Sequence, residues 1–321
     1  MIAGDTMKAA VYRRYGGIEE IQTATLPRPR AGAREVVVRV RASSVNPIDW
    51  KIRRGDLRIL SGKRFPRIPG ADLSGEVAET GSEVTEFAVG DEVFAMVNPL
   101  EGGCFAEYRA VPAALLVRKP VRLTHPEAAA VPLAALTADR VISLTPEVGS
   151  RSRPVLLVNG ASGGVGGFAV QLGVIKNTQV VGVCSARNAE YVQQLGATRV
   201  VAYDRQPVPE IDTAYELVFD AVGNLRYRRI RRHLTTSGVF VSILPEPRQW
   251  LERVTALWDP QRAMRVVVVK PDRAALEGLA ALLESGRLTV SIDREFSIEE
   301  AHEAHRYSET GRARGKIVVT I

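Results

Sequence analysis

A glycine-rich turn offers the clearest chemistry in the sequence. Residues 155–172, VLLVNGASGGVGGFAVQL, read as a strand, a turn and an apolar helix, with Gly160, Gly163 and Gly166 three residues apart. Glycine permits tight turns and a close approach to a pyrophosphate, and a helix start supplies free N–H groups and a positive dipole end. The turn therefore predicts a dinucleotide site, although glycines needed only for packing are the plainer alternative. The candidate contacts are Gly160, Ser162, Gly163, Gly164 and Val165.

The next strand predicts which nicotinamide coenzyme is used. In such a unit the second strand usually ends in an acid that binds the ribose hydroxyls of NAD. Here the run VVGVC at 180–184 is followed by Ser185 and Arg187 instead. Arginine binds phosphate through charge-assisted and often bidentate hydrogen bonds. The sequence therefore favours NADPH, with Ser185 and Arg187 at its 2′-phosphate; a surface Arg187 that starts the next helix is the alternative.

The segments around these motifs predict an α/β chain with two parts. Short apolar runs, typical of a β barrel or sandwich, lie at 35–44, 73–81, 90–97 and 105–112. Beyond Pro126, apolar strands alternate with helical segments, and their unbroken Val and Ile runs are typical of a parallel sheet covered on both faces. We therefore expect a doubly wound domain at residues 124–270. The tail GRARGKIVVTI should return to the first domain, because a single strand forms no core.

Bulk composition narrows the class of protein. The chain has 321 residues, of which 45% are hydrophobic and 25% charged, as in soluble globular proteins. No apolar run reaches the ~20 residues that a membrane helix needs, and the first residues lack the features of a secretory signal. Cys104 and Cys184 are too few for a disulfide framework or a thiolate zinc cluster. We expect a protein of the reducing cytoplasm.

The net charge of +7 includes one concentrated basic run, RYRRIRRH at 226–233. On a helix, Leu225, Ile230 and Leu234 could face inward while the arginines spread over the solvated face. A nucleic-acid patch is the alternative.

The ordered motifs resemble the zinc-independent quinone oxidoreductases of the medium-chain dehydrogenase/reductase superfamily. The resemblance covers nearly the whole chain and rests on MKAAVYRRYGG, NPIDWKIRRG, PGADLSGEV, GDEVFA, GCFAEYRAVP, AAAVPLAALTA, the glycine turn, SARN, LGATRVVAYD and the tail. It implies a GroES-like substrate domain at 1–123, completed by 271–321, and a Rossmann NADPH-binding domain at 124–270, with the coenzyme in the cleft between them. It also implies a homodimer joined through the last Rossmann strand, for which RVVVVK at 265–270 is the candidate.

The same resemblance implies that no zinc takes part. Zinc-dependent members of the superfamily place Cys and a Gly-His-Glu motif at the metal, and the matching positions here are Asn46 and Gly70-Ala71-Asp72. Catalytic zinc needs about three protein ligands. His302 and His305 belong to a charged helical segment and are expected to be surface residues.

Without a metal, the expected reaction is hydride transfer from NADPH to a quinone or to the β-carbon of an enone. The candidate catalytic residues are Lys51, Asn46 and Asp49. Lys51 would donate a hydrogen bond to the acceptor carbonyl or the ribose, and Asn46 and Asp49 would fix the nicotinamide side. A surface role for Lys51 and a capping role for Asp49 are the alternatives.

Further positions follow from the resemblance. The expected coenzyme contacts also include Thr137, Tyr203, Val222 and Ile243. Residues 245–260, with Trp250 and Trp258, should border the substrate mouth or the dimer interface. Two other functions stay open: an enoyl-thioester reductase of a biosynthetic pathway, and an NADPH-binding protein that binds RNA through the arginine run.

Overall fold

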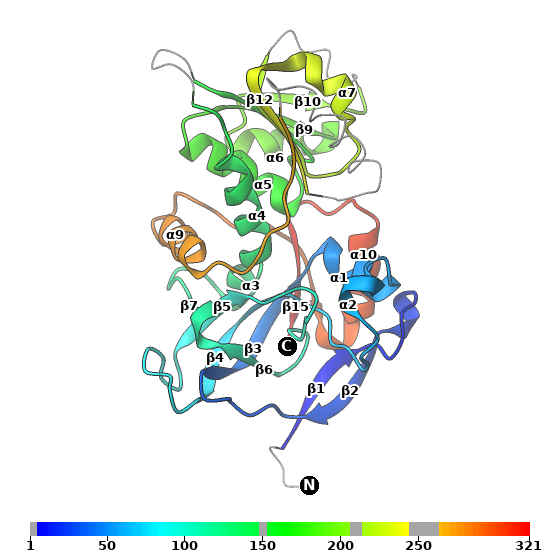
Figure 1. Ribbon diagram of the computed structural model, residues 1–321, viewed down its shortest axis with the longest axis vertical. Helices are drawn as coiled ribbons and strands as arrows, with labels where there is room; N and C mark the ends of the chain where they lie inside the picture. The colour runs from blue at the N-terminus through cyan, green and yellow to red at the C-terminus, as the bar shows by residue number, and fades with distance from the viewer. Residues whose placement is uncertain (1–4, 148–152, 206–213, 244–262) are drawn as a thin grey trace. The chain divides into compact units, whose positions relative to one another are not determined.

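The computed structural model describes residues 5–147, 153–205, 214–243 and 263–321. The chain divides into two compact units (Figure 1). Unit 1 comprises Met1–Leu136 and Lys270–Ile321, and unit 2 comprises Thr137–Val269. Among the described residues, no helix is both long and apolar enough to cross a membrane.

Unit 1 is built on a β-sheet whose described strands follow the order β14-β15-β3-β4-β5-β7, with β6 also paired to β3 and with β1 and β2 forming a separate pair. The strands are β1 (Thr6–Val11), β2 (Gln22–Pro27), β3 (Glu35–Val45), β4 (Asp72–Thr80), β5 (Glu92–Met96), β6 (Tyr108–Pro112), β7 (Val117–Arg118), β14 (Ile292–Ser297) and β15 (Lys316–Thr320). The helices are α1 (Pro47–Arg54), α2 (Arg58–Ser61), α3 (His125–Ala129), α9 (Arg273–Glu284) and α10 (Ala301–Glu309), and α4 (Pro132–Ile142) crosses into unit 2.

The long strand β3 organises unit 1. Its alternating Val36, Val38 and Val40 are buried in one apolar core cluster, as a half-buried strand requires. One edge of β3 pairs first with β6 over Glu35–Arg39 and then with β15 over Ala42–Val45. The register with β4 shifts between Val40 and Ala42, which marks a β-bulge where the partner strand changes. The C-terminal tail thus completes the sheet of the N-terminal part.

Unit 2 is a parallel sheet in the order β10-β9-β8-β11-β12-β13 within the described residues. Its strands are β8 (Val155–Asn159), β9 (Gln179–Cys184), β10 (Arg199–Ala202), β11 (Tyr215–Asp220), β12 (Leu234–Ser242) and β13 (Ala263–Val266). Helix α5 (Gly164–Ile175) packs on β8 and β9, α6 (Ala189–Gln194) on β9 and β10, and α7 (Tyr227–Ile230) on β12 (Figure 1). The strand order reverses between β8 and β11, which is where doubly wound sheets bind ligands.

Two expectations need correction. The strand expected at 265–270 is β13, and it ends at Val266, because the chain then leaves the sheet and by Lys270 belongs to unit 1. His305 is not a surface residue: it is 0% exposed. It follows Ala301 and Ala304 on the inward stripe of α10 and meets the ring of Phe105 edge to face, with 5.8 Å between the centroids. Its charged neighbours in the sequence lie on a different face of α10.

Candidate functional site

The predicted coenzyme residues of unit 2 gather at one edge of its sheet. The glycine turn follows β8, Ser185 follows β9, Tyr203 follows β10, Val222 follows β11 and Ile243 follows β12. Because all the described strand pairs of this sheet are parallel, these positions share its carboxyl edge. That edge is where open α/β sheets bind their ligands.

The glycine turn is too tight for other residues at two points. Gly160 has φ +82°, and a Cβ there would lie 2.7 Å from Cγ2 of Val222. A Cβ on Gly166 would lie 2.1 Å from the carbonyl oxygen of Gly160, which belongs to the backbone and has no room to move. Gly163, by contrast, has open surroundings, with its nearest atom at 3.4 Å. The turn therefore brings its backbone close to α5 and leaves the helix start at Gly164 available to an anion.

A buried acid shapes the neighbouring turn at the switch point. Asp220, at the end of β11 and 0% exposed, accepts hydrogen bonds from the N–H groups of Val222, Gly223 and Leu225 at 3.2, 2.9 and 2.9 Å. Burial raises the pKa of its carboxyl, and these N–H groups and the side chain of Asn159 oppose that rise. Val222, 46% exposed, is held by this turn against Gly160. Asp220 therefore fixes a predicted nicotinamide-pocket residue.

The end of β9 carries the predicted phosphate contacts. Ser185 is followed by a short 3₁₀ helix, Ala186–Asn188, in which Arg187 lies. The N–H of Ala186 donates a 2.9 Å hydrogen bond to the carboxylate of Asp204, which fixes the backbone between Ser185 and Arg187. Asn188 donates a 3.1 Å hydrogen bond to Oγ of Ser162 and so ties this turn to the glycine turn. The two motifs therefore form one continuous surface of unit 2.

The other predicted positions are less closely grouped. Thr137 is buried in α4, Tyr203 is 59% exposed, and Ile243 is half-buried just after β12. Trp250, Trp258 and the rest of residues 245–260 lie outside the described residues. Cys184, beside the phosphate contacts, is buried as expected, and burial raises its thiol pKa to about 11.

In unit 1, the predicted catalytic residues belong to the start of α1. The backbone N–H of Asn46 donates a 2.7 Å hydrogen bond to the carboxylate of Asp49, which is the reciprocal half of a capping box. Both residues are almost fully buried, at 2% and 3% exposure. Lys51 is half-buried, with its ammonium 5.8 Å from the ring centroid of Trp50. Asp49 therefore caps α1. Lys51 is the most solvent-accessible of the three predicted catalytic residues.

Asn46 also belongs to a buried polar cluster, which joins three distant parts of the chain. Its side-chain NH₂ donates to the carboxylate of Asp72 at 2.8 Å, and its side-chain oxygen accepts from Nζ of Lys316 at 2.6 Å. Asp72 also accepts hydrogen bonds from Ser44 Oγ at 2.6 Å and from the N–H of Leu133 at 2.8 Å, and Lys316 Nζ is 4.0 Å from it. The cluster ties α1 to β4 and β15.

Burial shifts the pKa values of Asp72, Lys316 and Asp49. It raises the pKa of Asp72 and lowers that of Lys316, while the attraction between the two opposes both shifts. It raises the pKa of Asp49 to about 7, against the effect of the N–H group of Asn46.

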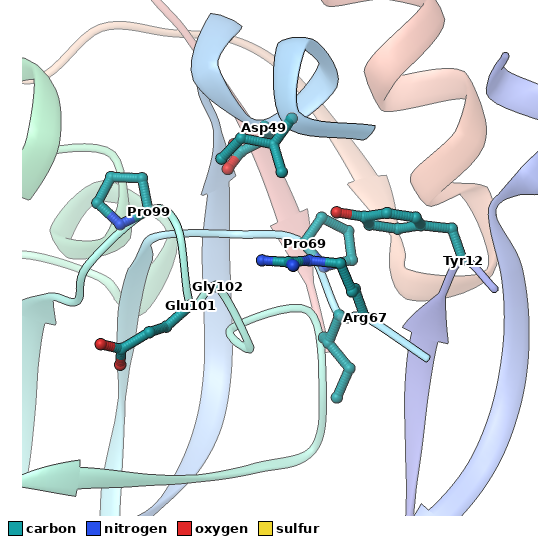
Figure 2. A pocket seen from close by; sticks show the side chains of 9 residues that line it. Tyr12, Asp49, Arg67, Pro69, Pro99, Glu101 and Gly102 are labelled. Atoms are coloured by element: carbon teal, nitrogen blue, oxygen red, sulfur yellow. The ribbon is translucent and has the colours of Figure 1, made fainter. Parts of the chain in front are cut away.

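Asp49 also lines a small cavity in unit 1. The cavity has a volume of about 10 Å³, room for about one water, and Tyr12 and Arg67 line it as well (Figure 2).

The structure shows two functional candidates that sequence reasoning missed, Asp220 and Lys316, and it gives a buried structural role to Asp72, which the sequence marked only as a position matching the zinc motif. Asp220 carried a local signal, an acid at the end of an apolar strand in FDAVG. Lys316 carried no such signal, and the partners of Asp72 could not be predicted, because they are far away in the sequence. In the arginine run, Arg226, Arg228, Arg229, Arg231 and Arg232 are exposed, while Ile230 and Leu234 are buried as expected.

The two units offer different kinds of site. The carboxyl edge of unit 2 fits a dinucleotide: it has a left-handed glycine, a free helix start and a serine and an arginine at the neighbouring strand end. The cluster in unit 1 does not fit a zinc ion. An ammonium group already neutralises its carboxylate, and within the described residues no group of three His, Cys, Asp or Glu side chains could hold a metal.

Comparisons with known proteins agree with this arrangement. The family model "Alcohol dehydrogenase GroES-like domain" matches residues 32–121, and the model "Zinc-binding dehydrogenase" matches 195–319. The chloroplast envelope quinone oxidoreductase homolog of Arabidopsis thaliana is 33% identical over 99% of both chains. The NADPH-dependent alkenal/one oxidoreductase of the same organism is 32% identical over 98% of this chain and 79% of its own. The quinone oxidoreductase structure from Coxiella burnetii has a TM-score of 0.91 at 30% identity, over 98% of this chain and 99% of that one.

Proposed function

Because this chain belongs to the quinone oxidoreductase family of the medium-chain dehydrogenase/reductase superfamily, we propose that it reduces a quinone or an α,β-unsaturated carbonyl compound with a nicotinamide coenzyme. The observation that carries the proposal is the contact between Gly160 and Val222 at the point where the strand order of unit 2 reverses. It brings the glycine turn and the adjoining β11 turn together at the edge where such sheets bind ligands.

The preferred coenzyme is NADPH. A bound reduced nicotinamide supplies the hydride. The N–H groups at the start of α5 would bind the pyrophosphate, which Gly160 and Gly166 allow to approach. Ser185 and Arg187 would bind the 2′-phosphate, and Asp204, which accepts the N–H of Ala186, supports the backbone between them.

We further propose that catalysis proceeds without zinc. The support is the donor set at Asn46 and Asp72, whose polar atoms bind one another and Lys316. In that case the negative charge that develops on the acceptor oxygen must be stabilised by hydrogen-bond donors. We assign this role to Lys51. Asn46 and Asp49 act through the capping box that holds the start of α1, and thus as positioning residues for Lys51.

The assembly and compartment are also proposals. β13 ends the sheet among the described residues, and Val268 just beyond it is 69% exposed. A sheet edge whose backbone groups are unpaired is commonly covered by a symmetry mate, which supports a homodimer. Cys104 and Cys184 are free thiols and both are buried, which is consistent with a reducing compartment such as the cytoplasm.

The test is a panel of acceptors. Purified protein is mixed with NADPH or NADH, and the loss of reduced-nicotinamide absorbance is followed with quinones, enones and enoyl thioesters. The proposal expects turnover of quinones or enones with NADPH. Turnover of enoyl thioesters alone would favour the alternative reductase, and coenzyme binding without turnover of any acceptor would reject an enzyme of this class.

A further inference from the structure

A second hollow lies in unit 1, away from the cluster around Asn46. It has a volume of about 180 Å³. It opens where the edge partner of β3 changes: β6 ends its pairing at Arg39, and β15 begins at Ala42. The lining residues are Thr6, Arg28, Arg39, Val40, Arg41, Glu107, Tyr108 and Ile321.

Arg28 is held rigidly in this hollow. Its guanidinium carbon lies 3.9 Å from the ring centroid of Tyr108, so the two groups stack. Its Nε is buried and has no hydrogen-bond partner among the described residues. The stacking on Tyr108 therefore fixes the guanidinium of Arg28 among the residues that line the hollow.

The charges around Arg28 leave the hollow basic. Arg41 is paired with Glu76 at 2.9 Å, and Glu107 accepts the backbone N–H of Lys8 at 2.6 Å. No ion pair joins Arg28 or Arg39 to a carboxylate within the ranges that the structure describes. Arg39 stands directly opposite Tyr108 in the β3–β6 register, so it lies beside the stacked Arg28. The guanidinium groups of Arg28 and Arg39 thus share one hollow with the carboxylate of Glu107, and together with Arg41 they give its lining a net positive charge.

We propose that this hollow binds the phosphate group of a small phosphate monoester. Guanidinium groups bind phosphate through bidentate, charge-assisted hydrogen bonds, which neutral ligands do not make. The hydroxyl of Thr6 adds a further donor. The hollow far exceeds the ~10–15 Å³ that a single water needs, and it has room for a phosphate and a short organic group. The lining of the hollow includes none of the residues assigned above to the coenzyme or to the proposed reaction.

The test titrates inorganic phosphate and glycerol phosphate into the full-length Arg187→Ala variant at constant ionic strength, followed by calorimetry. The Arg187→Ala background removes the phosphate contact predicted in unit 2. Saturable binding is expected, and Arg28→Gln with Arg39→Gln should weaken it at least tenfold. The matched control is Arg34→Gln, an exposed arginine of unit 1 paired with Glu83 at 2.6 Å, which should leave the affinity unchanged.

The remaining outcomes of this titration either support the proposed phosphate site or overturn it. If the double variant fails to fold, Arg39→Gln alone, at an exposed position, should still weaken binding several-fold. Unchanged affinity in a folded Arg39→Gln variant, absence of saturable binding, or tighter binding of citrate than of glycerol phosphate would overturn it.

Discussion

Nζ of Lys316 donates a 2.6 Å hydrogen bond to the side-chain oxygen of Asn46, 270 positions earlier in the sequence. The same amide donates to Asp72, so one short chain of hydrogen bonds joins β15, α1 and β4. A buried carboxylate is stable only when it is paired or well bonded. Nζ of Lys316 lies beside both Asn46 and Asp72, and through Asn46 it holds the start of α1 in place.

Lys316→Met should therefore be strongly destabilising. It leaves Asp72 buried without its cationic neighbour, which typically lowers the free energy of unfolding by about 3–5 kcal/mol. Urea unfolding measures the loss. Asp72→Asn in the same chain should recover part of it, and the exposed Lys63→Met should change little. A loss below about 1 kcal/mol, the range of exposed ion pairs, would show that the cluster does not depend on this charge.

The geometry of the glycine turn predicts that alanine substitutions at Gly163 and Gly166 have very different effects. Gly166→Ala places a Cβ 2.1 Å from a backbone oxygen and should abolish coenzyme binding or folding of unit 2. Gly163→Ala meets its nearest atom at 3.4 Å and should lower the free energy of unfolding by only about 0.5–1 kcal/mol, the usual penalty of alanine in place of glycine at an N-cap. Melting temperature and coenzyme titration check both variants. Equal behaviour of the two alanines would contradict the described turn.

Arg187→Ala should reduce the preference for NADPH over NADH. A charge-assisted hydrogen bond contributes about 1.5–3 kcal/mol, so the ratio of the two kcat/KM values should fall at least tenfold. The exposed Lys176→Ala, at the far end of α5, is the matched control for the loss of one surface charge. A ratio that survives Arg187→Ala intact would remove the proposed 2′-phosphate site.

His305 predicts an acid-sensitive core. Burial, helped by the nearby charge of Arg53, lowers its pKa to about 3 from an ordinary value of 6.5. The unfolded chain therefore binds more protons between these values, and stability is present above pH 6.5 and lost as the pH falls toward 3. His305→Phe should remove this loss, which is about 2 kcal/mol at pH 5. Unfolding free energies at pH 5 and pH 7.5 measure it.

The control for that measurement is His302→Phe, on the exposed side of the same helix. It should leave the pH dependence of the wild type in place. If His305→Phe and the wild type lose stability in parallel on acidification, the histidine does not account for the acid sensitivity.

The features that were predictable from the sequence are local ones. The glycine turn and the Val-rich strands carry their signals within a few residues, so the parallel sheet and the coenzyme edge could be predicted. The link from Lys316 to Asn46 could not, because both ends look ordinary until β15 pairs with β3. His305 was misjudged because its charged neighbours in the sequence lie on a different face of α10. The sequence left the role of Asp49 open between catalysis and helix capping. The hydrogen bond that its carboxylate accepts from the N–H of Asn46 gives it the capping role.

The most direct test of the central claim follows the hydride itself. NADPH that carries deuterium at the transferable position is mixed with the protein and an enone, and the product is analysed by mass spectrometry and NMR. The account predicts one deuterium, on the β-carbon of the saturated ketone. A reduced ketone without deuterium, or no reduction of either an enone or a quinone although the coenzyme binds, would contradict it.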